Sequence, residues 1–281
     1  MNQQDLQKWH AEELDILKRF ARYCDEFELS YFIHGGTLLG AVRHQGFIPW
    51  DDNVDVCMPR DDYNEFIERM EETNLPGPFR FLTFENTEGY RYPWARMIST
   101  NMKIINRHAK VPRIEHAYID ILPLDALPNQ SGERYIHKKD LQALWKFNDL
   151  VQYDELADQQ ANRGMIRYLA NKASGMVHGL VKSFNYKKVL RKINEELEEY
   201  NYRSDTEEVM NYLKSDGFRE TFPRRCFEEI AYYPFEDTFL AGPKDYDTVL
   251  RIIYGKDYMR IPADEYRKKN DDELVTETWR K

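Results

Sequence analysis

The chain has 281 residues and a mass of 33.7 kDa, which allows one large domain or two smaller ones. With 42% apolar and 32% charged residues, it is not collagen-like, low-complexity or wholly disordered. No segment reaches the ~18–20 apolar residues of a membrane span, and the N-terminus lacks the pattern of a signal peptide, so we expect a cytoplasmic protein. The three cysteines form no CxxC pair, which favours reduced thiols.

The charge of the chain is −9, and this acidic excess argues against binding to nucleic acid, which relies on basic surface to displace counterions. The charge is unevenly distributed. Between Arg80 and His116, seven bases accompany three acids, so this segment carries +4 while the remainder carries −13. A basic segment inside an acidic chain favours a small anionic ligand over a polymer.

Hydrophobic periodicity predicts alternating helices and strands in the first 125 residues. Apolar residues spaced by three and four predict an amphipathic helix over residues 3–28, whose apolar stripe is interrupted at Glu13. An aromatic and β-branched segment predicts a strand at 31–34, and Thr37 is the expected N-cap of the helix that follows. A second helix is expected at 60–72, and further strands at 54–58, 79–84, 92–98, 102–105 and 117–122.

These elements predict an α/β fold with a mixed sheet flanked by helices. Residues 131–202 have a helical pattern throughout, and the last 80 residues return to aromatic segments interrupted by prolines. No low-complexity linker or hinge separates these parts, so we expect a helical insertion or second lobe that packs tightly on the first.

The segment from His34 to Arg43 begins with two glycines, Gly35 and Gly36, ahead of a predicted helix. Glycines allow the backbone to approach a bound group, and a helix N-terminus offers free N–H donors and a positive dipole, which together suit an anion. Arg43, one or two helical turns further on, has a planar guanidinium that suits phosphate oxygens. A Gly-Gly-Thr turn is equally typical of a plain structural turn.

An acidic segment follows at residues 51–55. In a strand, Asn53 and Asp55 point to the same side while Val54 points to the other. Asp120 lies between two isoleucines in another predicted strand. Oxygen ligands on rigid strands are typical of a magnesium site beside a phosphate. Acids at strand ends also often only meet solvent, but three such groups downstream of a phosphate-type turn favour the metal site.

This combination resembles the pattern of the nucleotidyltransferase-fold superfamily: Gly-Gly-Ser/Thr, Asp-hydrophobe-Asp and a third Asp on a neighbouring strand. More specifically, GGTLLGAVRHQGFIPWDDNVDV is similar to the signature of the LicD family, which includes bacterial phosphocholine transferases and fukutin-type enzymes. The similarity continues at 92–96, 119–125, 242–247, 254–255 and 257–259. It implies a nucleotidyltransferase-like core at 1–130, a helical segment at 131–205 and a C-terminal segment, 206–281, that packs back on the core.

The resemblance implies metal-dependent transfer of phosphocholine from CDP-choline to a sugar hydroxyl of a cell-surface glycan precursor, of teichoic acid or lipopolysaccharide type. Mg²⁺ or Mn²⁺ is implied at positions 53, 55 and 120, and Asp120 is implied as the base for the acceptor hydroxyl. The Gly35-Gly36-Thr37 turn is implied to position the diphosphate.

Position 53 departs from the family pattern, because Asn stands where the pattern has the first metal-binding Asp. Asn keeps a carbonyl oxygen but loses the charge, so metal affinity and activity are expected to fall. The change is typical either of an engineered inactive form that traps a substrate or of a natural divergence with reduced or altered activity. The retained neighbouring motif residues favour the first.

Further candidates surround the motif. Arg43 and Arg96 are candidate phosphate ligands, with surface ion pairs as the alternative. Trp50, with Tyr92 and Trp94, is a candidate aromatic box for a trimethylammonium group, with core packing as the alternative. Asp51 is a candidate for a second metal or for the site entrance, and otherwise belongs to a solvated turn.

Three other readings stay open. They are a donor with another CDP-linked alcohol, ribitol or glycerol phosphate; nucleotidyl transfer as the reaction; and a catalytically silent binding protein, for which Asn53 is the argument. The partners we expect are a CDP-activated donor and a lipid-linked glycan acceptor. A basic and apolar face at 175–190 predicts peripheral contact with the inner face of a membrane, with a core-facing helix as the alternative.

Overall fold

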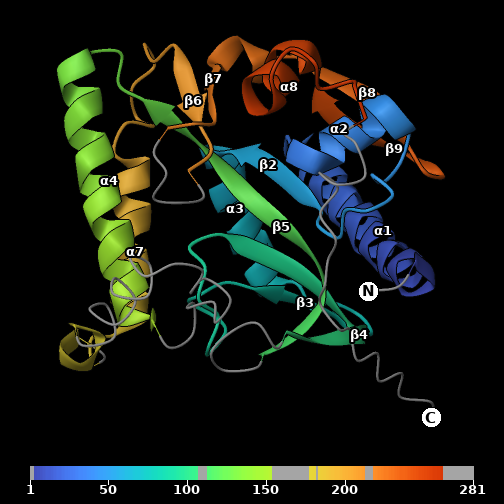
Figure 1. Ribbon diagram of the computed structural model, residues 1–281, viewed down its shortest axis with the longest axis horizontal. Helices are drawn as coiled ribbons and strands as arrows, with labels where there is room; N and C mark the ends of the chain where they lie inside the picture. Colours follow the sequence, from blue (N-terminus) through green and yellow to red (C-terminus); the bar gives the residue numbers. More distant parts are fainter. Residues whose placement is uncertain (1–2, 107–112, 154–176, 182, 213–217, 262–281) are drawn as a thin grey trace.

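The computed structural model describes residues 3–106, 113–153, 177–181, 183–212 and 218–261 (Figure 1). It has a mixed α/β fold, which confirms the predicted class. In the described residues, seven strands form one sheet, in which β1 to β5 follow the order β1-β2-β5-β4-β3. These strands are β1 (Phe32–Ile33), β2 (Asp55–Pro59), β3 (Phe79–Leu82), β4 (Ala95–Asn106), β5 (Arg113–Leu127), β6 (Glu208–Met210) and β7 (Thr221–Pro223).

Strand β5 organises this sheet. It runs parallel to β2 on one side and antiparallel to β4 on the other, and its far end pairs with β6, which pairs in turn with β7. The parallel register places Asp55 directly beside Asp120. Residues whose side chains are to act together are therefore fixed on neighbouring rigid strands.

Two helices pack on the sheet and bury the larger core. Helix α1 (Gln3–Phe27) packs on β4 and β5, and α3 (Arg60–Glu72) packs on β2 and β5 (Figure 1). As the sequence predicted, Glu13 interrupts the apolar stripe of α1, and its carboxyl is completely buried there. Burial, with the charge of Asp52, raises the pKa of Glu13 well above its usual value.

A second core lies between α4 (Ser131–Val151) and α7 (Tyr186–Glu198), which stand side by side at the left of Figure 1. Apolar side chains from both helices meet there, among them Leu141, Trp145, Leu190 and Ile193. The remaining elements are α2 (Gly35–His44), η2 (Arg224–Phe227), the hairpin β8 (Ile230–Phe235) and β9 (Thr238–Pro243), and α8 (Tyr246–Tyr254). Of these, β9 packs against β1, and α8 against α2.

Two predicted strands are in fact one. The sequence predicted separate strands at 92–98 and 102–105, but β4 is continuous from Ala95 to Asn106. Its register against β5 shifts between Ser99 and Lys103, so the polar residues between the two predicted strands form an irregularity inside one strand. Cys24, Cys57 and Cys226 are all buried free thiols, as predicted.

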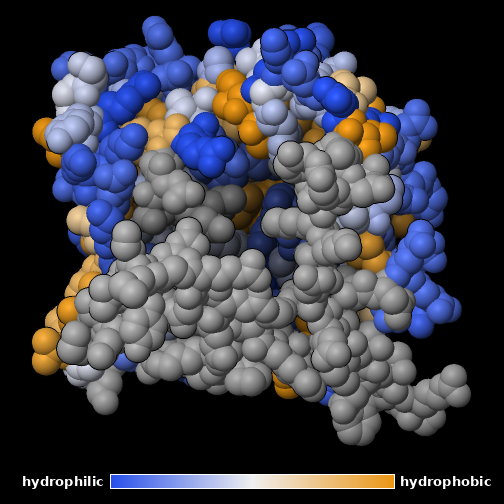
Figure 2. Space-filling view, viewed as in Figure 1, coloured by the Kyte–Doolittle hydropathy of each residue, from blue (hydrophilic) through white to orange (hydrophobic). Residues whose placement is uncertain are grey.

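None of the helices in the described part of the chain is long and apolar enough to cross a membrane. Hydrophobic surface occurs in separate patches in Figure 2, including one at the lower left, where Figure 1 shows residues 177–181. Val177, Leu180 and Phe184 are exposed in this region, whereas Leu190 is buried. The predicted face at 175–190 is therefore divided between core and surface, and three of its residues, 175, 176 and 182, lie outside the described residues.

Candidate functional site

The first turn of α2 receives two carboxylates. Gly35 has φ +52°, a conformation that side chains disfavour. A Cβ added at Gly36 would lie 2.5 Å from Oδ2 of Asp51, and one at Gly35 would lie 3.5 Å from Oδ2 of Asp55. The two glycines thus admit negatively charged groups to the positive end of a helix, where backbone N–H groups are free.

Thr37 has another role than the predicted one. The helix begins at Gly35, with His34 in the N-cap position, so the prediction that Thr37 is the N-cap is wrong. The Thr37 hydroxyl instead accepts a hydrogen bond from the backbone N–H of Asp55, at 2.9 Å. The physical reason is that α2 begins three residues earlier than expected, directly after β1 and His34. Thr37 therefore ties α2 to the start of β2 and fixes the backbone of Asp55.

Asp55 and Asp120 form the centre of the site. Burial, and next the charge of Asp120, raise the pKa of Asp55 to about 7. Asp120 has positive partners: Arg96 donates to both its oxygens, at 2.7 and 3.0 Å, and the Trp94 indole donates to one of them, at 2.9 Å. One carboxylate of the pair is thus compensated, whereas Asp55 forms no ion pair with a Lys or Arg side chain of the described residues. A divalent cation beside Asp55 would supply the missing positive charge, so these residues fit a metal.

Asn53 lies at the rim of this pair. It is exposed and precedes β2, and its Oδ1 accepts a hydrogen bond from the Tyr118 hydroxyl at 2.8 Å. The Arg96 guanidinium lies 3.7 Å from the centre of the Tyr118 ring. Position 53 is therefore connected to Asp120 through Tyr118 and Arg96, which the sequence pattern did not indicate.

The other predicted site residues fall into two groups. Arg43, near the end of α2, donates to the backbone oxygen of Tyr258 at 3.0 Å, and its guanidinium lies 5.9 Å from the Trp50 ring. Separately, Tyr92 packs on Trp94 with ring centroids 5.0 Å apart, beside Arg96. Trp50 thus contacts Arg43 on α2, whereas Tyr92 contacts Trp94 and Arg96 at the start of β4.

Tyr254 is a site residue that sequence reasoning missed. It is the last residue of α8, and its hydroxyl would lie 3.9 Å from a Cβ at Gly35. Burial, and next the charges of Asp51 and Asp55, raise its pKa. Its only sequence signal was its place in the 254–255 motif.

A pair formed by His34 and Glu220 was also missed. Their Nε2 and Oε2 atoms lie 2.9 Å apart. Burial alone lowers the pKa of His34, but Cys57 and Glu220 outweigh it, and the pKa is raised well above its usual value. His34 directly precedes the glycine pair. Glu220 lies 186 residues away in sequence and belongs to none of the motifs, so nothing in the sequence indicated that the two would pair.

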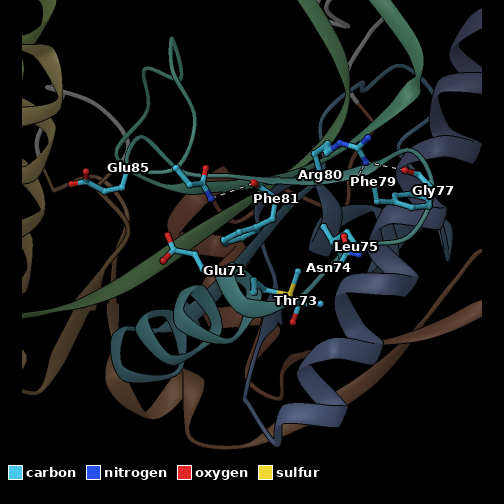
Figure 3. Close-up of a pocket in the computed structure, with 11 residues that line it drawn as sticks. Glu71, Thr73, Asn74, Leu75, Gly77, Phe79, Arg80, Phe81 and Glu85 are labelled. Carbon is cyan, nitrogen blue, oxygen red and sulfur yellow. Dashed lines mark hydrogen bonds between the residues drawn. The ribbon is translucent and has the colours of Figure 1, made fainter.

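A surface cavity of about 720 Å³ lies elsewhere, between the end of α3 and β3. Figure 3 shows Glu71, Thr73, Arg80 and Phe81 around it, with the Arg80 side chain hydrogen-bonded to the backbone of Gly77. None of its lining residues belongs to the Asp55–Asp120 site. We therefore place the chemistry at the acidic pair and the glycine turn, where charged groups converge, and not at this cavity.

Comparison with known proteins identifies a related family. Residues 28–147, which contain the glycine turn and both aspartates, match the family model "LicD/FKTN/FKRP, nucleotidyltransferase domain". This match confirms the predicted resemblance to the LicD family over residues 28–147.

Among individual proteins, the chain is similar to "Lipopolysaccharide cholinephosphotransferase LicD" of Haemophilus influenzae, with 26% identity over 261 residues that cover 91% of each chain. An uncharacterized protein of Rickettsia typhi is 53% identical over 38 residues, 14% of this chain and 12% of that protein. One of Rickettsia prowazekii is 56% identical over 34 residues, 12% of this chain and 13% of that protein.

Proposed function

We propose that the chain transfers phosphocholine from CDP-choline to a sugar hydroxyl of a cell-surface glycan precursor, of lipopolysaccharide or teichoic acid type. The observation that carries this proposal is the Asp55–Asp120 pair beside the glycine-led end of α2, inside a LicD-type domain. The similarity to a lipopolysaccharide cholinephosphotransferase extends over nearly the whole chain and supports this donor and acceptor class.

Asp55 and Asp120, with the residue at position 53, are the proposed ligands of Mg²⁺ or Mn²⁺. When bound, this metal supplies charge neutralisation for the diphosphate and for the departing CMP. The free N–H groups at Gly35 and Gly36 bind phosphate oxygens. Thr37 holds the backbone of Asp55 in place for both tasks.

The proton of the acceptor hydroxyl requires a base. Asp120 is the base that the family resemblance implies, and Arg96 and Trp94 hold its oxygens in a fixed orientation. Asp55, with its pKa raised to about 7, is the alternative proton acceptor. An Arg96→Met variant that keeps its rate but shifts the pH profile upward supports Asp120, whereas an unchanged profile supports Asp55.

We propose that Asn53 lowers the activity, because an amide oxygen brings less negative charge to a metal than a carboxylate does. The alternative of a silent binding protein rests on the same residue. Release of CMP by the Asn53 form, in the presence of Mg²⁺, would exclude that alternative.

The decisive experiment follows the two halves of the donor separately. The chain is incubated with Mg²⁺, a lipopolysaccharide or teichoic acid acceptor, and CDP-choline labelled either in choline or in cytidine. We expect the choline label on the glycan and the cytidine label in CMP. Cytidine on the acceptor would instead establish nucleotidyl transfer. Turnover of CDP-ribitol or CDP-glycerol, but not of CDP-choline, would show that the donor carries a different alcohol from the one proposed.

We also propose that the acceptor is lipid-linked and reached from the inner face of the membrane. The exposed apolar residues Val177, Leu180 and Phe184 support contact with lipid. The bases of this region contribute less than expected, since Lys187 and Arg191 are paired with Glu88 and Glu85. Binding to neutral and anionic vesicles should therefore differ little.

A further inference from the structure

A polar cluster lies between α4 and α7, away from the proposed transferase site. His137 on α4 is buried, with its imidazole directed at two carboxylates of the other helix. Its Nδ1 lies 3.1 Å from Oε1 of Glu196 and 3.7 Å from Oε2 of Glu199. One ligand atom from each of the three side chains lies within 4.8 Å of the others.

The spacing along each helix repeats. Glu196 and Glu199 are three residues apart, and so are His137 and Asp140, which places each pair on one face of its helix. The charge of Asp140 acts on all three members of the cluster. Two facing helices thus bring one imidazole and two carboxylates together, and Asp140 follows His137 one turn further along α4. Such an arrangement suits a metal in a helical bundle.

The charges distinguish this cluster from a surface ion pair. At the same end of α7, Glu195 is paired with Lys192, and Glu198 with Arg60. Within the described part of the chain, no Lys or Arg nitrogen lies within the 4.0 Å of an ion pair to Glu196 or Glu199. Glu195 and Glu198 thus have cationic partners at ion-pair distance, whereas Glu196 and Glu199 face the imidazole, and Lys192 acts on Glu196 only from a longer distance.

We propose that His137, Glu196 and Glu199 bind a divalent transition-metal ion of the zinc class, with Asp140 or water as the fourth ligand. A buried imidazole nitrogen selects such ions over Mg²⁺, which prefers oxygen ligands alone. Zinc is held by nitrogen and oxygen ligands at about 2.0–2.2 Å, so small side-chain movements close the observed cluster around it. The ion joins α4 to α7 and is independent of the transferase reaction.

The test is a Zn²⁺ titration of the full chain, in competition with a chromophoric chelator and with excess Mg²⁺ present to occupy the Asp55–Asp120 site. We expect one zinc site in the parent, with at least tenfold weaker affinity in Glu199→Gln. Glu199 is largely exposed, so this variant should fold. The matched control is Glu195→Gln on the outer face of α7, which should bind zinc as the parent does.

A second readout assigns the ligands. Replacement of zinc by Co²⁺ should give the visible absorption of a four-coordinate ion in the parent and in Glu195→Gln, but not in His137→Gln or Glu199→Gln. Absence of zinc binding in the parent overturns the proposal. So does equal binding in Glu199→Gln, or a zinc site that disappears only in Asp55→Asn.

Discussion

The Asp55–Asp120 site on strands β2 and β5 and the interface between α4 and α7 both gather acidic side chains, but the negative charge is compensated differently in each. At the Asp55–Asp120 site, Arg96 neutralises Asp120, and the positive end of α2 faces Asp51 and Asp55. The site is thus suited to an anionic substrate. At the helix interface, the imidazole of His137 faces the two glutamates, and no Lys or Arg nitrogen of the described residues lies at ion-pair distance from them. Acids beside fixed positive groups suit the binding of phosphates, whereas acids around a lone buried histidine suit a bound cation.

The largest effect is expected at Asp55. Asp55→Asn should reduce transfer by about a thousandfold, because it removes a proposed metal ligand. In the metal-free protein, however, the same substitution should increase the free energy of unfolding. The raised pKa of about 7 means that the charged form opposes folding above that pH.

The free energy of unfolding of Asp55→Asn, measured by urea denaturation, should therefore exceed that of the parent by about 1–3 kcal/mol at pH 8. The difference should shrink as the pH falls from 7 toward 4, because native Asp55 is then protonated. A variant that is less stable than the parent at pH 8 would contradict this account.

The Arg60–Asp125 ion pair contrasts with Asp55, because its buried carboxylate has a buried cationic partner. Arg60 donates to both oxygens of Asp125, at 2.7 and 2.6 Å, and both side chains are buried. Arg60→Met should lower the free energy of unfolding by about 3–5 kcal/mol, because it leaves the buried Asp125 carboxylate without its cationic partner. Arg69→Met is the control, since Arg69 forms an exposed pair with Glu65, and it should cost less than about 1 kcal/mol.

Restoring the family residue should raise activity. Asn53→Asp is expected to increase Mg²⁺-dependent release of CMP at least tenfold, about 1.4 kcal/mol of transition-state stabilisation. The carboxylate can still accept the hydrogen bond from Tyr118, so the fold should be unaffected. Asn53→Ala serves as the control and should give no gain. Equal rates in Asn53→Asp and the parent would remove the explanation of low activity through this residue.

The smallest effect is expected at Glu13. Burial and the charge of Asp52 raise its pKa well above the usual value, which favours the neutral carboxyl. Glu13→Gln should therefore change the free energy of unfolding by less than about 1 kcal/mol, since no charge is removed. Glu13→Ala should cost about 2 kcal/mol or more, because it leaves a cavity next to Trp9. A large loss in the Gln variant would mean that the carboxyl is ionised.

Much of the fold was predictable from local patterns. Helix α3 occupies the predicted residues 60–72, and α1 ends one residue before the predicted limit. Periodicity succeeds for such helices because one face is buried along their whole length. It failed for the division of β4, where polar residues within a continuous strand imitate a loop.

The sequence by itself determined the nucleotidyltransferase motif and the candidate pair, because Asp55 and Asp120 are each flanked by apolar residues that must enter a buried sheet. Only the tertiary structure decided that the two are neighbours in register and that Arg96 binds one of them. It also brought Tyr254, Glu220 and the cluster at His137 into place. These contacts join residues far apart in the chain, and local patterns carry no information about which distant partner a charged side chain meets.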